Sequence, residues 1–321
     1  MLNSSVKDAM RCPVCRAGLT GWQSEGRRTA TLACTGCGQT YPLVNGVPIL
    51  IHEGNSLFSI ADFTNHRATT FRPRSRLKDR VQKLLPSISG NPQGPANIHC
   101  FLKALLNHAD RPVVLVVGAG EGGSAIAPLR EHPQVEIVTS DVHLGKATAL
   151  VMDAHDIPFA DGTFDGIVVQ AVLEHVVDPY RCVAEIHRVL RPGGVVFSET
   201  PFMQQVHMGA YDFTRFTPLG HRRLFRHFEQ IAGGPNGGQG MVLAWSWLYF
   251  LRGFVQDQRG RQAAEMIARL TAFWLPWFDT LLAGRPSAWD GAKGSFFVGR
   301  KSERALPDRE LIQLYGGLDR A

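Results

Sequence analysis

Four cysteines near the N-terminus are spaced like metal ligands. Cys12 and Cys15 form one C-x-x-C pair, Cys34 and Cys37 form a second, and eighteen residues separate the two pairs. A tight turn at each pair would aim two thiolates at one ion, and four thiolates complete a tetrahedral structural zinc site. A segment of about fifty residues buries too little apolar surface to fold well alone, so the metal would supply folding free energy. We therefore predict a structural Zn²⁺ bound by these cysteines in a ribbon over residues 1–55.

A second candidate site begins at a glycine-rich loop. The apolar run 113–117 predicts a buried strand that leads into this loop. The glycines of the loop are Gly118, Gly120, Gly122 and Gly123. Their spacing fits a loop that passes under a nucleotide-bearing cofactor, although a plain strand-to-helix turn has the same composition. Asp141 lies twenty-one residues after Gly120 and follows the next predicted strand, 136–140, where a carboxylate can accept hydrogen bonds from both ribose hydroxyls. These residues leave both NAD and S-adenosylmethionine open.

A second carboxylate favours S-adenosylmethionine. Asp153 ends the apolar run A-L-V-M at 149–152, and an acceptor there suits the exocyclic amine of an adenine lying across the strand ends. Only twelve positions separate Asp141 from Asp153. A parallel crossover normally needs a dozen or more residues, usually with a helix. We therefore expect the connecting helix to be reduced to a turn.

These residues need a parallel α/β scaffold to bring them together. From Arg111 onward, apolar runs alternate with segments of helical periodicity, which predicts βαβ units. A fourth strand ends at Gln170, and a fifth spans 195–199. Between them a helix starts at Pro179, with Asp178 as its N-cap. The carboxyl ends of such strands meet at one edge of the sheet, where ligands collect.

Four further motifs lie along this scaffold in a fixed order. They are D-A-H-D-I-P-F at 153–159, F-D at 164–165, L-E-H-V at 173–176 and V-L-R-P-G-G at 189–194. With the glycine loop, they make residues 111–230 resemble the class I S-adenosylmethionine-dependent methyltransferases, particularly the type 11 branch. The resemblance implies S-adenosylmethionine as the cofactor. It also implies an α/β fold, with a Rossmann-like, doubly wound, mostly parallel seven-stranded sheet.

The resemblance assigns roles to individual residues. The implied cofactor-binding residues are Gly118, Gly120 and Gly122 under the methionine part, Asp141 at the ribose, Asp153 and Ala154 at the adenine, and Gln170 at the methionine end. The family usually has an acid where this chain has Val116, so one contact to the amino group must come from elsewhere. The ribbon itself is similar, over residues 10–51, to that of the activator subunits of tRNA methyltransferases, through its two C-x-x-C pairs and the continuation C-G-Q-T-Y-P-L-V-N-G-V-P-I-L.

Candidate groups for the methyl acceptor follow the fourth and fifth predicted strands. A hydroxyl acceptor needs a base for its proton, and a histidine or carboxylate at the pocket mouth is the usual one. The candidates are Glu174 and His175 after the fourth strand, and His207, Tyr211 and Asp212 after the fifth. His175 could instead cap a helix or bond a carbonyl. The later group, with Arg215, could hold the acceptor or close a lid over the cofactor, and Asp212 with Arg215 could simply fix the loop.

The remaining segments allow several partners. Residues 67–83 carry seven basic side chains and one acidic one, so 56–96 is predicted to be a basic linker or a phosphate-contacting patch for RNA. A methyltransferase domain is expected over 97–321, with a tryptophan-rich helical insertion at about 241–290 that could pack on the sheet, form a lid or touch a membrane surface. No transmembrane run is apparent, no secretory signal is recognisable, and the cysteine usage suits a reducing cytoplasm.

Three functions stay open at this point. The leading one is a methyltransferase for a small-molecule or lipid- or sugar-linked acceptor. The second is an rRNA or tRNA methyltransferase, although the net charge of +6 is weaker than that of a dedicated nucleic-acid binder. The third is an inactive cofactor-binding protein that recruits a partner. The acceptor, the atom methylated and the oligomeric state do not follow from the sequence.

Overall fold

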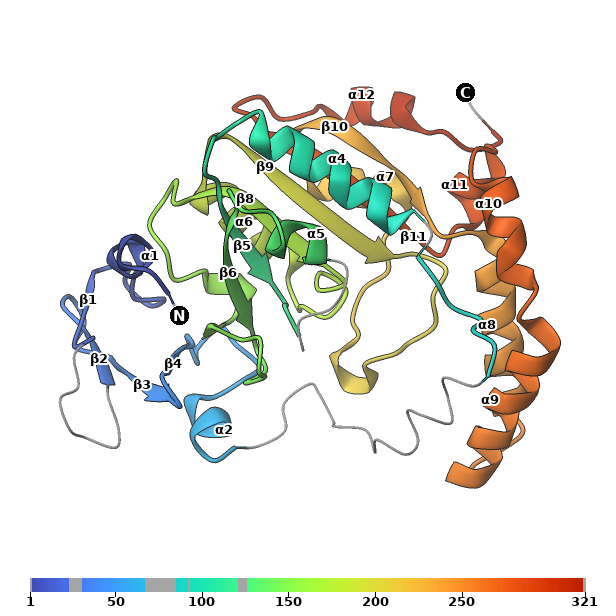
Figure 1. Cartoon of the computed structure of the whole chain (residues 1–321), viewed down its shortest axis with the longest axis horizontal. Helices are drawn as coiled ribbons and strands as arrows, with labels where there is room; N and C mark the ends of the chain where they lie inside the picture. Colours follow the sequence, from blue (N-terminus) through green and yellow to red (C-terminus); the bar gives the residue numbers. More distant parts are fainter. Residues whose placement is uncertain (1, 23–30, 67–84, 92, 121–125, 320–321) are drawn as a thin grey trace.

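The apolar runs that follow Arg111 form the centre of a mixed sheet. The computed structural model describes residues 2–22, 31–66, 85–91, 93–120 and 126–319. Within these residues, eleven strands lie in the order β1-β2-β3-β4-β7-β6-β5-β8-β9-β11-β10 (Figure 1). Strands β7, β6, β5, β8 and β9 are parallel, and β11 and β10 add antiparallel pairs. The strands are β1 Leu19–Thr20, β2 Thr31–Cys34, β3 Thr40–Val44, β4 Val47–Leu50, β5 Val113–Val117, β6 Glu136–Asp141, β7 Leu150–Met152, β8 Phe164–Gln170, β9 Leu190–Pro201, β10 Phe228–Asn236 and β11 Gly294–Lys301.

Helices cover both faces of the sheet, because successive strand residues point to opposite sides. Val114 and Val116 of β5 pack with Phe101 of α4. Leu115 packs on the other face, in the cluster that contains Ile186 of α6. The α-helices are α1 Ser4–Ala9, α2 Ile60–Thr64, α4 Gly94–Leu106, α5 Ala127–Arg130, α6 Pro179–Val189, α7 Pro218–Leu224, α8 Gln239–Arg252, α9 Gln258–Ala272, α10 Phe278–Leu282, α11 Ser287–Gly291 and α12 Asp308–Leu311. Short 3₁₀ turns are η2 Ala154–Asp156, η3 Gly209–Tyr211, η4 Leu275–Trp277 and η5 Ile312–Leu314.

The prediction of seven strands is wrong for this sheet. Residues 97–321 supply seven strands, β5 to β11, and the N-terminal segment adds four more. Strand β4 pairs in parallel with β7, placing Ile49 opposite Val151 and Leu50 opposite Met152. Strands β1 to β3 extend from β4 through antiparallel pairs. The predicted division at residue 55 stays a prediction, but the sheet joins the two sides of it.

The connection between β6 and β7 contains no helix, as its length predicts. Residues 142–149 form bends and turns, and β7 still pairs in parallel with β6. The N-terminal segment packs on this helix-free connection. Phe58 and Phe63 of that segment form a cluster with Val142 and Leu144 of the connection. Phe58 and Phe63, which belong to the predicted linker, therefore cover the part of the sheet that a crossover helix would otherwise cover.

Helices α8 to α11 follow β10 and precede β11, which is the predicted place of the insertion. They lie at the edge of the molecule opposite β1 to β4 (Figure 1). Helices α8 and α9 pack on each other through Ala244, Leu248 and Ala268. The same region exposes large apolar side chains, including Phe254 between α8 and α9 at 74% and Trp277 of η4 at 68%. None of the helices described is long and apolar enough to cross a membrane.

Candidate functional site

A cavity of about 330 Å³ lies at the carboxyl ends of β5, β6, β7 and β8. This volume falls in the range of small-molecule sites. Its walls come from six separate stretches of the chain. The lining residues are Leu57, Phe58, Val117, Gly118, Gly120, Ser140, Asp141, Val142, His143, Met152, Asp153, Ala154, His155, Ala171, Val172, His175, Val176, Val177, His207, Met208 and Tyr211. Of the described residues predicted for the cofactor and the acceptor, all line this cavity except Gln170, Glu174, Asp212 and Arg215.

The glycine loop borders the cavity with bare backbone. Gly118 and Gly120 have φ angles of 71° and 54°, in the left-handed region that favours glycine. A Cβ atom at Gly118 would lie 2.2 Å from Cγ2 of Val172, whereas a Cβ atom at Gly120 would meet no atom within 4 Å. The protein's own packing therefore requires glycine at 118, while Gly120 faces open space. Gly122 lies outside the described residues.

Asp141 anchors the glycine loop and faces the cavity. One of its carboxylate oxygens accepts from the Gly120 N–H at 2.6 Å, and the other accepts from the His143 N–H at 2.9 Å. Burial raises the pKa of the Asp141 carboxyl, and these N–H groups oppose the rise. An ionised carboxylate offers about four acceptor positions. The backbone donors do not saturate it, so it can still accept from a ligand hydroxyl.

Asp153 faces the same cavity and also contacts other side chains. Its Oδ1 accepts from the His155 N–H at 3.0 Å and lies 2.6 Å from Nδ1 of the same residue. Its Oδ2 accepts from the Ser56 hydroxyl at 2.6 Å. Although desolvation acts the other way, the hydrogen bonds from His155 and Ser56 hold the pKa of Asp153 below its usual range. Asp153 is therefore ionised at neutral pH, and its Oδ2 keeps an acceptor position for a ligand amine.

Part of the cavity wall comes from the segment predicted as linker. Leu57 and Phe58 line the cavity, and the Phe58 ring stacks on Tyr211 with centroids 5.6 Å apart. The segment is tied down by Asp156, which accepts from Asn55 at 3.0 Å. Tyr211 and Phe58 thus form one side of the cavity together, and Phe58 was not predicted from the sequence. A usable signal was the short connection after Asp141, because it leaves one face of the sheet without a helix.

The two histidines predicted for the acceptor meet at one end of the cavity. The ring centroids of His175 and His207 lie 4.8 Å apart. Oε1 of Glu174 lies 3.6 Å from Nε2 of His175 and 3.9 Å from Nε2 of His207. Burial raises the pKa of Glu174 to about 7 and lowers the pKa of both histidines. The cluster can therefore exchange a proton near neutral pH.

Asp212 and Arg215 form the structural pair that the sequence allowed. Nη2 of Arg215 donates to Oδ2 of Asp212 at 2.7 Å, and Nη1 donates to Oδ1. The His207 N–H also donates to Asp212, at 2.9 Å. Although desolvation opposes the charge, the Arg215 guanidinium lowers the pKa of Asp212 to about 2. Asp212 therefore fixes the loop that carries His207 and is not part of the cavity wall.

Gln170 does not line the main cavity. Its Nε2 donates to Oε2 of Glu199 at 2.6 Å. It lines a smaller neighbouring cavity of about 100 Å³, together with Ile126. Ala171, with a φ angle of 52°, lines the main cavity instead. The smaller cavity also borders Gly118, and the contact of Gln170 with a cofactor stays a prediction.

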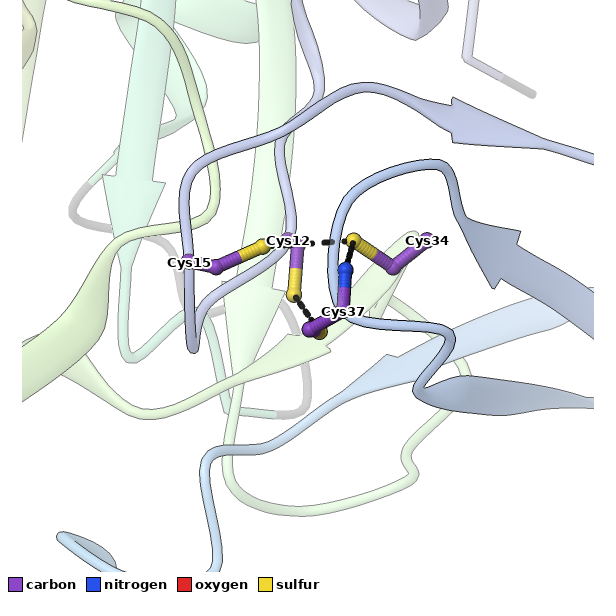
Figure 2. Close-up of side chains that lie close together, drawn as sticks. All are labelled: Cys12, Cys15, Cys34 and Cys37. Carbon is purple, nitrogen blue, oxygen red and sulfur yellow. Dashed lines mark hydrogen bonds between the residues drawn. The ribbon is translucent and has the colours of Figure 1, made fainter.

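The four cysteines predicted as metal ligands converge on one point (Figure 2). The Sγ atoms of Cys12 and Cys37 are 3.7 Å apart, those of Cys15 and Cys34 are 3.3 Å apart, and all four lie within 4.8 Å of one another. Tetrahedral zinc–thiolate bonds of about 2.3 Å would place the sulfurs roughly 3.8 Å apart. The N–H groups of Gly36 and Cys37 donate to Sγ of Cys34 at 3.3 and 3.4 Å, which stabilises a thiolate there. The cluster therefore fits a four-thiolate metal site.

The ribbon lies directly against the motif that begins at Asp153. The Arg11 N–H donates to the carbonyl oxygen of Pro158 at 2.9 Å. The Arg16 guanidinium, which follows the first cysteine pair, donates to Glu185 of α6 at 2.8 Å. The ribbon that carries the cysteines therefore contacts the motif 153–159, which also supplies Asp153 and Ala154 to the cavity wall.

Known proteins resemble a part of this chain. Residues 115–198 match a family described as a methyltransferase domain. The ubiquinone/menaquinone biosynthesis C-methyltransferase UbiE of Geotalea daltonii is 34% identical over 86 residues, which are 26% of this chain and 37% of that protein. The O-methyltransferase rstn1 of Aspergillus nomiae is 34% identical over 95 residues, which are 25% of this chain and 42% of that protein. The chain thus spans less than half of the length of either relative.

Solved structures also include similar chains. Phosphoethanolamine N-methyltransferase 2 of Haemonchus contortus, solved in complex with S-adenosyl-L-methionine, is 16% identical, with a TM-score of 0.39 over 64% of this chain and 53% of that one. Residues 115–198, which match the methyltransferase-domain family, contain the glycine loop and both cavity carboxylates.

Proposed function

We propose that this protein is an S-adenosylmethionine-dependent methyltransferase for a small-molecule acceptor, with a structural Zn²⁺ in its N-terminal ribbon. The observation that carries the proposal is one cavity in which Gly118, Gly120, Asp141 and Asp153 meet within a methyltransferase domain. When bound, the cofactor supplies a methyl group on a sulfonium, which is already a good leaving group. The protein therefore needs mainly to orient the two reactants and exclude water.

The carboxylates and the bare loop would hold the cofactor. Asp141 would accept from the ribose hydroxyls, because its carboxylate faces the cavity and is not saturated by backbone donors. Asp153 would accept from the adenine amine through Oδ2. Phe58 and Val142 would pack on the apolar faces of the nucleoside. Gly120 would let the methionine part approach the backbone, since nothing occupies the space beside it.

The acceptor would lie at the end of the cavity lined by His175, His207 and Met208. The imidazoles and the neighbouring Glu174 would take the proton of an acceptor hydroxyl. A cavity of about 330 Å³ favours a small molecule or the reactive end of a lipid- or sugar-linked one. The RNA alternative rests on the basic residues 67–83, which lie outside the described residues.

The zinc would act on structure rather than on chemistry. Four thiolates fill a tetrahedral shell and leave no open position for a substrate. Its role would be to hold β1 to β3, and with them the strand β4 that borders β7. The segment that carries Phe58 follows β4 directly, so the ribbon would support the cofactor wall.

Calorimetric titration of the zinc-loaded chain tests the proposal. S-adenosylmethionine should bind at one site, and NAD should not bind. Replacing Asp141 by Asn should weaken binding by about 2 kcal/mol, roughly 30-fold, because one charged acceptor is lost. The matched control is Asp110→Asn, an exposed carboxylate that precedes β5 at its opposite end. Unchanged affinity of the Asp141 variant would refute the ribose assignment, and no binding to the parent chain would refute the function.

A further inference from the structure

A buried carboxylate at the acceptor end of the cavity lacks hydrogen-bond partners. The side chain of Glu174 is 1% exposed. Neither of its oxygens has a hydrogen-bond partner among the described residues. A buried carboxylate without donors is costly unless a charge or a metal ion compensates it. Nε2 of His175 and Nε2 of His207 lie 3.6 and 3.9 Å from its Oε1.

Both histidines are oriented so that Nε2 faces this carboxylate. Nδ1 of His175 lies 2.7 Å from the carbonyl oxygen of Tyr211, which can only accept. Nδ1 of His207 lies 3.3 Å from Oδ2 of Asp212, and Arg215 holds that carboxylate in place. Nδ1 of His175 therefore carries its proton, which leaves a lone pair on Nε2, and the Asp212 carboxylate beside Nδ1 of His207 favours the same arrangement there. Metal-binding histidines are typically fixed in this way by a second hydrogen bond.

We propose that Glu174, His175 and His207 form a binding site for a divalent transition-metal ion, separate from the cysteine cluster. The three ligand atoms lie within 4.8 Å of one another. Metal–ligand bonds of about 2.0–2.1 Å in a tetrahedron place the ligands roughly 3.4 Å apart, so small side-chain shifts would close the site. Two imidazoles and one carboxylate suit Zn²⁺, Fe²⁺, Co²⁺ or Mn²⁺.

The open coordination positions of this ion would face the cavity, because His175 and His207 line it. This consequence rests on the proposed function. With the ion bound, Glu174, His175 and His207 would act as its ligands in place of their role as the base. An acceptor hydroxyl that binds there would then lose its proton to solvent, since a cation lowers the pKa of a bound oxygen. A lone pair of that oxygen then forms the O–CH₃ bond as the S–CH₃ bond breaks, and the electron pair of the broken bond stays on sulfur. The acceptor class is therefore a hydroxyl compound able to ligate a metal.

Metal content and titration of the full chain test the site. Protein whose ribbon is loaded with Zn²⁺ should bind one further equivalent of Co²⁺, and the absorption spectrum should lack a new cobalt–thiolate charge-transfer band. Glu174→Gln and His207→Gln should each weaken this second site at least tenfold while the first equivalent of zinc stays bound. His187→Gln is the matched control, because His187 contacts Ser302, His227 and Phe228 away from the cavity.

The proposal would be overturned if the parent chain bound no second ion, or if both ligand variants bound it as tightly as the parent. In that case the buried Glu174 carboxylate is stabilised by a proton that it shares with His175 or His207. His207→Gln keeps the test sound if Glu174→Gln fails to fold, because His207 lies on a partly exposed loop. S-adenosylmethionine titrated in the presence of a chelator that spares the ribbon reports on the proposed function alone, so the two failures are distinguishable.

Discussion

Replacing Gly120 by Ala separates a role in the cofactor site from a role in the fold. Gly120 has a φ angle of 54°, so Ala there should cost about 1–2 kcal/mol of unfolding free energy. Its Cβ atom would meet no protein atom within 4 Å, so no further loss of stability is expected. If the cofactor passes beside this residue, the added methyl group overpacks the complex by about 1–3 kcal/mol, which weakens binding roughly 5- to 150-fold.

Two further glycines provide the comparison. Gly46, with a φ angle of 80° in the β3–β4 turn, also has open space around its Cβ position. Gly46→Ala should therefore lose as much stability as Gly120→Ala and keep full affinity. Gly118→Ala should lose more stability and more affinity for S-adenosylmethionine than Gly120→Ala, because its Cβ atom would lie 2.2 Å from Cγ2 of Val172. Urea unfolding gives the stabilities and calorimetry gives the affinities for S-adenosylmethionine. The reasoning fails if Gly120→Ala binds the cofactor as Gly46→Ala does.

Two other predictions concern stability and the ribbon. His221 is buried between Ser198 and Ser295. Its burial, and to a smaller extent the positive charge of Arg222, lower the pKa of His221 to about 3. Below its unfolded pKa of about 6.5 only the unfolded chain takes up this proton, so urea unfolding should show a loss of about 3 kcal/mol between about pH 7 and pH 4.5. His221→Gln should flatten that dependence, and an unchanged slope would contradict the assignment. Cys34→Ser should release zinc and, because β4 and Phe58 border the cavity, weaken S-adenosylmethionine binding measurably. Zinc loss with full affinity would show that the ribbon does not support the cofactor wall.

The central strands could be predicted because buried parallel strands have continuous apolar sequences. Strand β5 matches the predicted run 113–117, and β6 matches the predicted strand before Asp141. Strand β10 could not be read in this way. The glycine-rich stretch that begins at Gly233 indicates a loop, yet it pairs along β11, with Gly233 opposite Phe297. The partner strand supplies the regular hydrogen bonding that the local sequence does not favour.

The candidate site was predictable where two neighbouring strands supply the glycine loop and a carboxylate. Asp141 and the glycine loop follow neighbouring strands, and the parallel sheet brings them within 2.6 Å. The contacts of Ser56 with Asp153 and of Phe58 with Tyr211 depend on pairs far apart in the chain. Such contacts follow from the parallel pairing of β4 with β7, which no local pattern specifies. The hydrogen bond of Gln170 to Glu199 could not be predicted for a similar reason, because Glu199 comes from the next strand.

A crystal structure of the zinc-loaded chain with S-adenosylhomocysteine tests the central claim most directly. The account predicts the ribose hydroxyls within hydrogen-bonding distance of Asp141, the adenine amine at Asp153, and the amino-acid part beside Gly118 and Gly120. A nucleoside bound elsewhere, or an empty cavity with both carboxylates turned to other partners, would contradict it.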